Sequence, residues 1–245
     1  MTLVGVALAL TIGVAMGLFG AGGSLLLVPA FTYLLGFDAK QAVGTSLVVV
    51  GISAAVGSIA RMMQARFPLK PALVLGAATV LGAFAGSAIG ARLDNDVQLR
   101  MFGVVVAIAA AGLGWQSFIG DGAVRPPRGR VVLAAAGIGV GFLTGLLGVG
   151  GGFLIVPALV MAANLEMREA SSVSLFVIVL ATTSAFVGYA GTATPVWSFV
   201  LPFATVASAA TIAGGMAAHA VPQRLLQQTF AMVLIVVAAY VVIRG

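Results

Sequence analysis

Two glycine-rich stretches decide how this chain folds. They are "GLFGAGGSLLLVP", from Gly17 to Pro29, and "GLLGVGGGFLIVP", from Gly145 to Pro157. Each lies inside a long apolar run, where a helix is expected. A glycine inside a helix costs about 1 kcal/mol relative to alanine, so clustered glycines predict a place where a helix stops and restarts. The sequence therefore predicts two broken helices at corresponding places in the chain.

The two stretches belong to an internal repeat with one constant offset in numbering, which takes Gly17 to Gly145. The same offset takes Asp38 to Glu166 and Lys40 to Arg168 without a gap. Chance similarity between apolar segments would not preserve glycine, proline and charge positions together. The repeat therefore indicates an internal duplication.

Polar segments divide each half into apolar spans. In the first half the broken run 2–36 is followed by expected spans at about 41–63, 71–92 and 97–118. The stretch 120–130 is the most polar, and its Pro-Pro pair stops any helix. The predicted domains are a first transmembrane repeat at 1–118, a polar cytoplasmic linker at 119–130, and a second transmembrane repeat at 131–245.

The composition predicts an integral membrane protein. Of the 245 residues, 61% are hydrophobic and 7% are charged, whereas a soluble domain has about 25% charged residues. The apolar runs are unbroken, so the spans are expected to be helical and not strands of a barrel. We predict an all-α, polytopic, multi-pass protein of the cell inner (plasma) membrane.

The charged residues indicate topology and no nucleic-acid partner. The net charge is +6, but the arginines occupy short loops, as expected for the cytoplasmic side of a membrane protein. The chain has no cysteine, which excludes thiolate metal sites and redox-active thiols. We predict no metal, no cofactor and no enzyme activity. The oligomeric state stays open, with a homo-oligomer as one option.

The two repeats could be parallel or inverted in the membrane. As one helix the run 2–36 would be about 52 Å long, against about 30 Å for the hydrocarbon core. One overlong span makes the halves parallel, whereas two short helices make them inverted. The loop 61–70 has three basic residues and its counterpart 189–198 has none, which favours opposite sides. The inverted scheme also places eight basic residues inside and four outside, whereas the parallel scheme places seven inside and five outside. We favour inverted repeats, each with a glycine-broken first helix and three further spans.

The glycine pattern resembles a known family. The pattern G-x-x-x-G-x-x-G-x-G-G-[GS] followed by V-P, present twice, resembles the TauE/SafE family of membrane permeases, the sulfite-exporter type. The segments "AVGTSL" (42–47) and "ASSVSL" (170–175) are also similar to that family, and the resemblance covers nearly the whole chain. It implies a transporter of sulfite, organosulfonates or related sulfur oxyanions. The halves differ at Ser24 and Gly152, so they are not interchangeable in the site.

A broken helix exposes backbone groups that can bind an anion. At the restart, four N–H groups lack an intrahelical acceptor and carry partial positive charge. Two such breaks near the bilayer midplane would hold an anionic substrate, and alternating access would move it. The candidate substrate-binding residues are the glycines of both breaks and the hydroxyls that follow them: Gly20, Gly22, Gly23, Ser24, Thr45, Ser46, Gly148, Gly150, Gly151, Gly152, Ser172 and Ser174.

Other interpretations compete with this one. Glycines at four-residue spacing pack membrane helices closely, and we assign Gly82, Gly86 and Gly90 to packing. The hydroxyls could instead bond to their own helices. We assign Arg61 to membrane topology, with attraction of anions at the inner mouth as the alternative, and Tyr189 to an interfacial aromatic belt. A passive channel or pore for a small solute is the alternative function.

Overall fold

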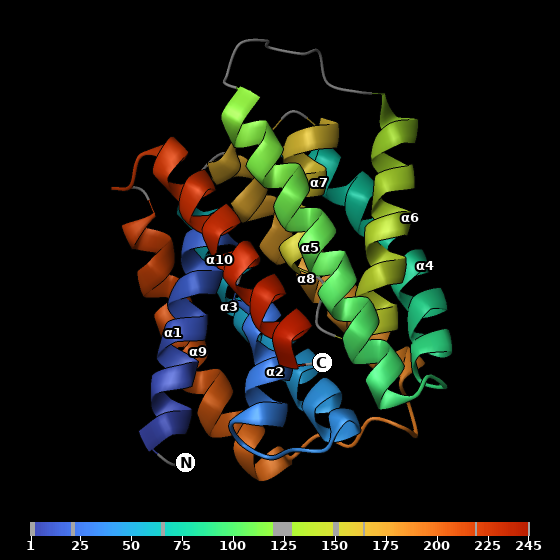
Figure 1. The fold of residues 1–245 in the computed structure, drawn as a ribbon. Coiled ribbons are helices and arrows are strands. Elements are labelled where there is room, and N and C mark those ends of the chain that lie inside the picture. The colour runs from blue at the N-terminus through green and yellow to red at the C-terminus, as the bar shows by residue number, and fades with distance from the viewer. Residues whose placement is uncertain are drawn as a thin grey trace.

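The structure is a computed structural model that describes residues 3–20, 23–64, 67–119, 129–148, 152–163, 165–218 and 220–244. The described residues form ten α-helices (Figure 1). Most of the predicted linker, 120–128, lies outside the described residues. The helices are α1 (Leu3–Phe19), α2 (Ser24–Tyr33), α3 (Ala39–Gln64), α4 (Leu69–Gly90), α5 (Asn95–Ile119), α6 (Arg130–Leu147), α7 (Gly152–Ala163), α8 (Met167–Gly188), α9 (Trp197–Ala217) and α10 (Gln223–Arg244).

The first apolar run forms two short helices and not one overlong span. α1 has 17 residues and α2 has 10. At 1.5 Å per residue α2 is about 15 Å long, which is half of the hydrocarbon core. The N-terminus and the loop after α2 lie at the same end of the molecule in Figure 1, so α1 and α2 form a hairpin. α6 and α7 are divided in the same way.

Helix starts recur at the offset of the sequence repeat. The offset that takes Gly17 to Gly145 also relates the first residues of four pairs of helices: Ser24 and Gly152, Ala39 and Met167, Leu69 and Trp197, Asn95 and Gln223. In Figure 1, α1 rises from the end that holds the N-terminus, whereas α6 descends from the opposite end. α1 and α6 therefore run in opposite directions.

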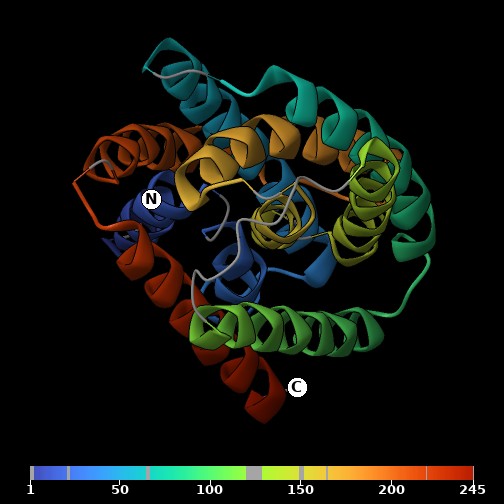
Figure 2. The ribbon, with the colours of Figure 1, turned by 90° about the horizontal axis from the view of Figure 1, so that it is seen from above.

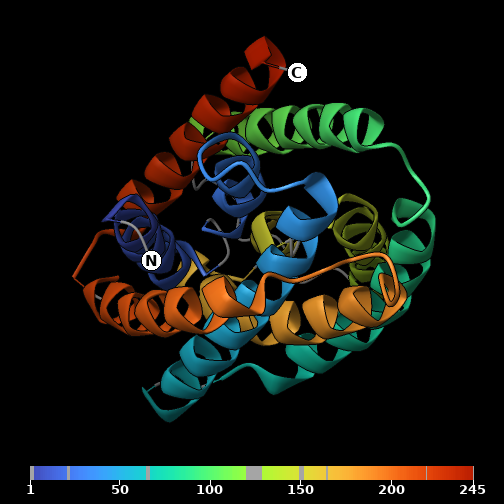
Figure 3. The same ribbon diagram turned by 90° about the horizontal axis from the view of Figure 1, so that it is seen from below.

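The helices that follow the two breaks, α2 and α7, lie inside the bundle. α3, α4, α8 and α9 are long and apolar enough to cross a membrane. Seen from above, α2 (blue) and α7 (yellow) lie in the middle of the other helices (Figure 2), and the two contact each other. From below, α3 (light blue) crosses beside them (Figure 3). The protein is a polytopic membrane protein whose centre holds the two shortest helices of the described part.

Glycines bring several helices into backbone contact. A Cβ on Gly86 of α4 would lie 2.8 Å from the backbone nitrogen of Leu146 in α6. Gly82 and Gly90 face α6 in the same way, so the prediction that these three glycines pack helices is confirmed. Gly17, within the glycine motif itself, packs on α9, where its Cβ would lie 2.6 Å from the nitrogen of Gly215.

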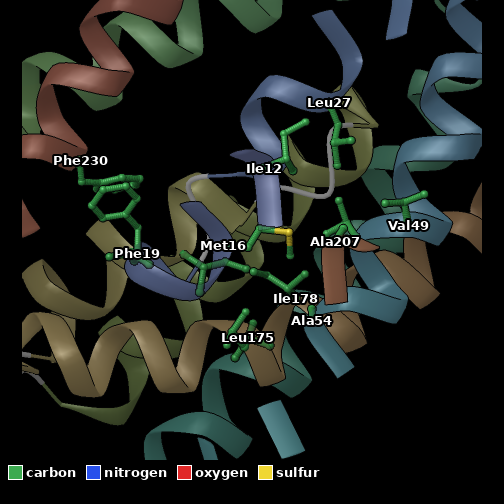
Figure 4. Close-up of a cluster of buried hydrophobic side chains, with 14 of the residues drawn as sticks. Ile12, Met16, Phe19, Leu27, Val49, Ala54, Leu175, Ile178, Ala207 and Phe230 are labelled. Carbon is green, nitrogen blue, oxygen red and sulfur yellow. The ribbon is translucent and has the colours of Figure 1, made fainter. Parts of the chain in front are cut away.

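The core fixes the end of α1 beside the first break, which is the segment between α1 and α2; the second break is the segment between α6 and α7. Ile12 and Met16 of α1 lie near Leu27 of α2 and the apolar side of α8 (Figure 4). The rings of Phe19 and Phe230 lie 5.4 Å apart between centroids. Helix association within a membrane depends on such van der Waals contacts, because lipid is as apolar as the core. This packing holds the start of the break in one position.

Candidate functional site

The first break rests on serines of the other half. Gly20 has a φ of 80°, which only glycine adopts readily. A Cβ at this position would collide with the carbonyl oxygen of Ser171 and with Ser174 Oγ, both in α8. Ser171 Oγ donates a hydrogen bond to the Phe19 carbonyl at 3.1 Å. α8 therefore binds the backbone on which α1 ends.

The second break rests on the first half in the reciprocal way. Gly148 has a φ of 63° and packs against the side chain of Val43 in α3. Ser46 Oγ donates to the Gly148 carbonyl at 3.3 Å and to the Val43 carbonyl at 2.9 Å. Each break thus contacts a serine-bearing helix of the opposite half, as Gly20 contacts Ser174.

The restart of α2 has no side-chain cap. Gly23 is its N-cap residue and provides no side-chain hydrogen bond, and the Leu26 N–H donates to the Gly23 carbonyl at 3.2 Å instead. Gly23, Ser24 and Gly152 are all buried. The other predicted glycines of the breaks lie outside the described residues: Gly22, Gly150 and Gly151.

Of the predicted hydroxyls, Ser46 and Ser174 lie against the breaks, whereas Ser172 contacts Arg61 and Thr45 contacts the segment before α9. Three of the four also bond to their own helices. Ser174 Oγ donates to the Ser171 carbonyl at 2.9 Å, and Ser172 Oγ donates to the Arg168 carbonyl at 3.0 Å. Ser46 bonds to its own helix as well as to Gly148. Thr45 Oγ1 accepts a hydrogen bond from the Val196 backbone at 3.1 Å, so it holds the segment before α9.

Arg61 lies inside the bundle and not in a loop at the membrane surface. The residue is 4% exposed. Its Nη2 donates to the Gly17 carbonyl at 2.6 Å and its Nη1 to Ser172 Oγ at 3.4 Å. A buried charge costs several kcal/mol unless it is compensated, and the carbonyl end of α1 compensates only part of it. Arg61 therefore belongs to the surroundings of the first break.

Tyr189 is also buried and does not belong to an interfacial belt. It is 0% exposed. Its Oη accepts a hydrogen bond from Gln98 Nε2 at 2.7 Å and donates one to the Leu146 carbonyl at 3.1 Å. Burial raises the pKa of the Tyr189 phenol well above its usual range, so the group stays neutral at physiological pH.

Replacing Tyr189 by phenylalanine is expected to lower the free energy of unfolding by about 1 kcal/mol, because two buried hydrogen bonds are lost. Thermal unfolding of the purified protein in detergent measures the change. The matched control is Thr205→Val, which removes an exposed hydroxyl bonded only to its own helix. Equal stability of the two variants would contradict the role of the Tyr189 phenol.

The chain is similar to one transporter family and to proteins named as probable membrane transporters. Residues 5–241 match the family described as "Sulfite exporter TauE/SafE". A probable membrane transporter protein of Xylella fastidiosa (strain Temecula1 / ATCC 700964) is 30% identical and covers 96% of this chain and 92% of the relative. A probable membrane transporter protein of Haemophilus influenzae is 29% identical over 92% of both chains. No solved structure matches the chain.

Proposed function

Because the chain belongs to the TauE/SafE family of sulfite-exporter-type membrane transporters, we propose that it carries a small sulfur oxyanion, such as sulfite or an organosulfonate, across the cell membrane. Membership of a transporter family also means that the protein is not an enzyme.

The proposed architecture is a pair of inverted repeats joined by a cytoplasmic linker. The recurrence of helix starts at the repeat offset supports the duplication, and the opposite directions of α1 and α6 in Figure 1 support the inversion. α3 ends and α8 begins at the end of the molecule where α6 begins, so Arg61 and Arg168 both lie at that end. An excess of arginine favours this end as the cytoplasmic one.

The proposed binding site lies between the two breaks. The observation that carries it is the reciprocal contact of each break with the opposite half: Gly20 on α8 and Gly148 on α3. The N-terminus of α2 has no side-chain cap, and the partial positive charge of the helix dipole at this end attracts the anion. α2 and α7 contact each other, so both helix starts can act on one substrate.

The reciprocal contacts also suggest how access alternates. A rocking motion between the halves moves Ser46 relative to Gly148 and Ser174 relative to Gly20 at the same time. One motion therefore remodels both breaks, as expected for transport by inverted repeats. An anion that leaves a cell gains about 2.3 kcal/mol per charge for each 100 mV of inside-negative potential. Export in this scheme needs no coupling ion.

Flux of radiolabelled sulfite from liposomes that contain the purified protein tests the proposal. We expect efflux that saturates with sulfite concentration and accelerates when a potassium gradient with valinomycin makes the interior negative. Protein-free liposomes are the control. Folded protein that transports neither sulfite nor an organosulfonate would overturn the proposal. Unitary current steps in a planar bilayer would show that the protein is a channel and not a carrier.

A further inference from the structure

Gln98 joins the two halves of the chain beside the second break. The residue lies near the start of α5, at the end of the molecule that holds the N-terminus (Figure 1), and is 5% exposed. Its Nε2 donates to Tyr189 Oη at 2.7 Å and to the Leu146 carbonyl at 2.8 Å. Tyr189 Oη also donates to the Leu146 carbonyl at 3.1 Å. These three groups form a closed triangle, the Gln98 latch, which ties α5 of the first half to the ends of α6 and α8 of the second half.

Two glycines leave room for the hydroxyl at the centre of the latch. A Cβ on Gly90 of α4 would collide with Tyr189 Oη and with the Leu146 carbonyl oxygen. A Cβ on Gly148 would lie 3.3 Å from the same hydroxyl, so the latch touches the glycine at which the second break begins. Because Leu146 precedes Gly148 by two residues, a movement that shifts this break also pulls on the latch.

The corresponding position of the other half shows that the fold does not need this glutamine. The repeat offset pairs Gln98 with Leu226 of α10, which is 2% exposed and belongs to the hydrophobic core. A buried amide needs hydrogen-bond partners, whereas a leucine contributes apolar contact alone. Inside a membrane, polar side chains of this kind link one helix to another. Gln98 therefore supplies a link between the halves that packing by itself does not require.

The opposite end of the molecule, which holds Arg61, has weaker links between the halves. The short bond of Arg61, at 2.6 Å, goes to the Gly17 carbonyl of its own half. Its bond to Ser172 of the other half measures 3.4 Å, which lies beyond the usual range of about 2.7 to 3.2 Å. Ser171 Oγ reaches the Phe19 carbonyl of the first half at 3.1 Å. The two short bonds of the latch therefore hold the halves together more firmly at the other end.

We propose that Gln98 is a positioning residue that keeps the second break closed and so biases the empty protein to open first at the Arg61 end. The inference rests on the proposed function, in which the halves rock and the two ends open in turn. A rocking motion breaks the hydrogen bonds between the halves at the end that opens, so the end with the longer bonds opens more often. With the Arg61 end as the cytoplasmic one, the empty protein is ready to receive an anion from the cell interior.

Cysteine accessibility tests this proposal, because the chain has no cysteine of its own. Val43→Cys places a thiol beside the second break, and Ser171→Cys places one beside the first break. The two positions correspond through the repeat offset, and both are buried. Each protein is placed in lipid nanodiscs, where both faces meet the solvent, and reacts with a small charged thiol reagent. The reaction rate measures how often the break beside the thiol opens to solvent.

Gln98→Leu, which introduces the residue found at the corresponding position of the other half, is then combined with each cysteine. We expect the reaction rate of Val43→Cys to rise at least about fivefold, because two hydrogen bonds between the halves are lost. The rate of Ser171→Cys should not rise with it, since molecules that open at one end are withdrawn from those that open at the other. A merely structural glutamine would loosen the whole fold on removal, and both rates would rise together.

Two further variants accompany this experiment. Tyr189→Phe removes the hydroxyl but leaves the bond from Gln98 to the Leu146 carbonyl, so it should raise the Val43→Cys rate by less than Gln98→Leu does. It decides the question if Gln98→Leu does not fold. Gln228→Leu is the matched control, because it makes the same chemical change at an exposed position of α10 and should alter neither rate.

The outcomes separate the latch from the transport function. A selective rise at Val43→Cys, with Gln228→Leu unaffected, supports the latch. An unchanged Val43→Cys rate in folded Gln98→Leu, or an equal rise at Ser171→Cys, would overturn it even if the unsubstituted protein transports sulfite. Absence of sulfite flux by the unsubstituted protein would overturn the transport function instead, since the thiol reaction needs no substrate.

Discussion

Valine in place of Gly141 is expected to destabilise the protein by at least about 3 kcal/mol, because it overpacks a backbone contact between α6 and α4. A Cβ at Gly141 would lie 2.8 Å from Thr79 Cα and 2.9 Å from the Thr79 carbonyl carbon. Both atoms are backbone, so no side chain can rotate away, and the helices must separate. The two methyl groups of valine increase the separation. Loss of the folded species on heating, followed by size-exclusion chromatography in detergent, measures the effect.

Gly139→Val is the matched control for this experiment. Gly139 lies in the same helix, two residues earlier, and nothing lies within 4 Å of a Cβ placed there. The chemical change is identical, and the expected effect on stability is within about 0.5 kcal/mol. If the two variants unfold at the same temperature, α4 and α6 do not pack through Gly141.

Local signals in the sequence predicted most of the architecture. The break between α1 and α2 follows from the low helix propensity of glycine, which needs no knowledge of neighbouring helices. The spans follow from hydropathy and from polar loops, and the expected span 41–63 lies within α3. Close packing at Gly86 follows from four-residue spacing, because glycine is the residue that lets membrane helices approach each other.

The burial of Arg61 and Tyr189 could not be predicted, because it depends on tertiary contacts that no local sequence signal indicates. Both residues follow an apolar span, where a topology arginine and an interfacial tyrosine are expected. Burial arises because α1 and α8 surround Arg61 and because Gln98 reaches Tyr189. One signal was present: the repeat offset pairs Arg61 with Tyr189, and a charge that one half lacks is unusual for a structural position.

The serines show why sequence left two interpretations open. Ser46 and Ser174 bond to their own helices, as short hydroxyls inside helices commonly do. They also contact the breaks of the opposite halves, because α3 and α8 cross at the centre of the molecule. Both interpretations therefore apply to the same side chains. The reciprocity of these contacts was not predictable from spacing, since it depends on which half packs against which.

Alanine in place of Gly20 is expected to lower sulfite flux at least about tenfold, because it moves the first break away from α8. The substitution has two separate consequences. A φ of 80° costs an alanine about 1 kcal/mol, and the added methyl group collides with the Ser171 carbonyl and Ser174 Oγ. A displacement of about 1 Å in a binding geometry can cost up to about 100-fold in rate. Flux from liposomes with equal amounts of folded protein measures the loss.

Gly36→Ala separates the collision from the backbone strain. Gly36 has a φ of 70°, so alanine there has a similar conformational cost, but nothing lies within 4 Å of the added methyl group. We expect this variant to lose about 1 kcal/mol of stability and to retain its sulfite flux. Equal flux in the two variants would mean that transport does not depend on how the first break rests on α8. A selective loss in Gly20→Ala would show that the break acts through Ser171 and Ser174, since the strain is common to both variants and the contact is not.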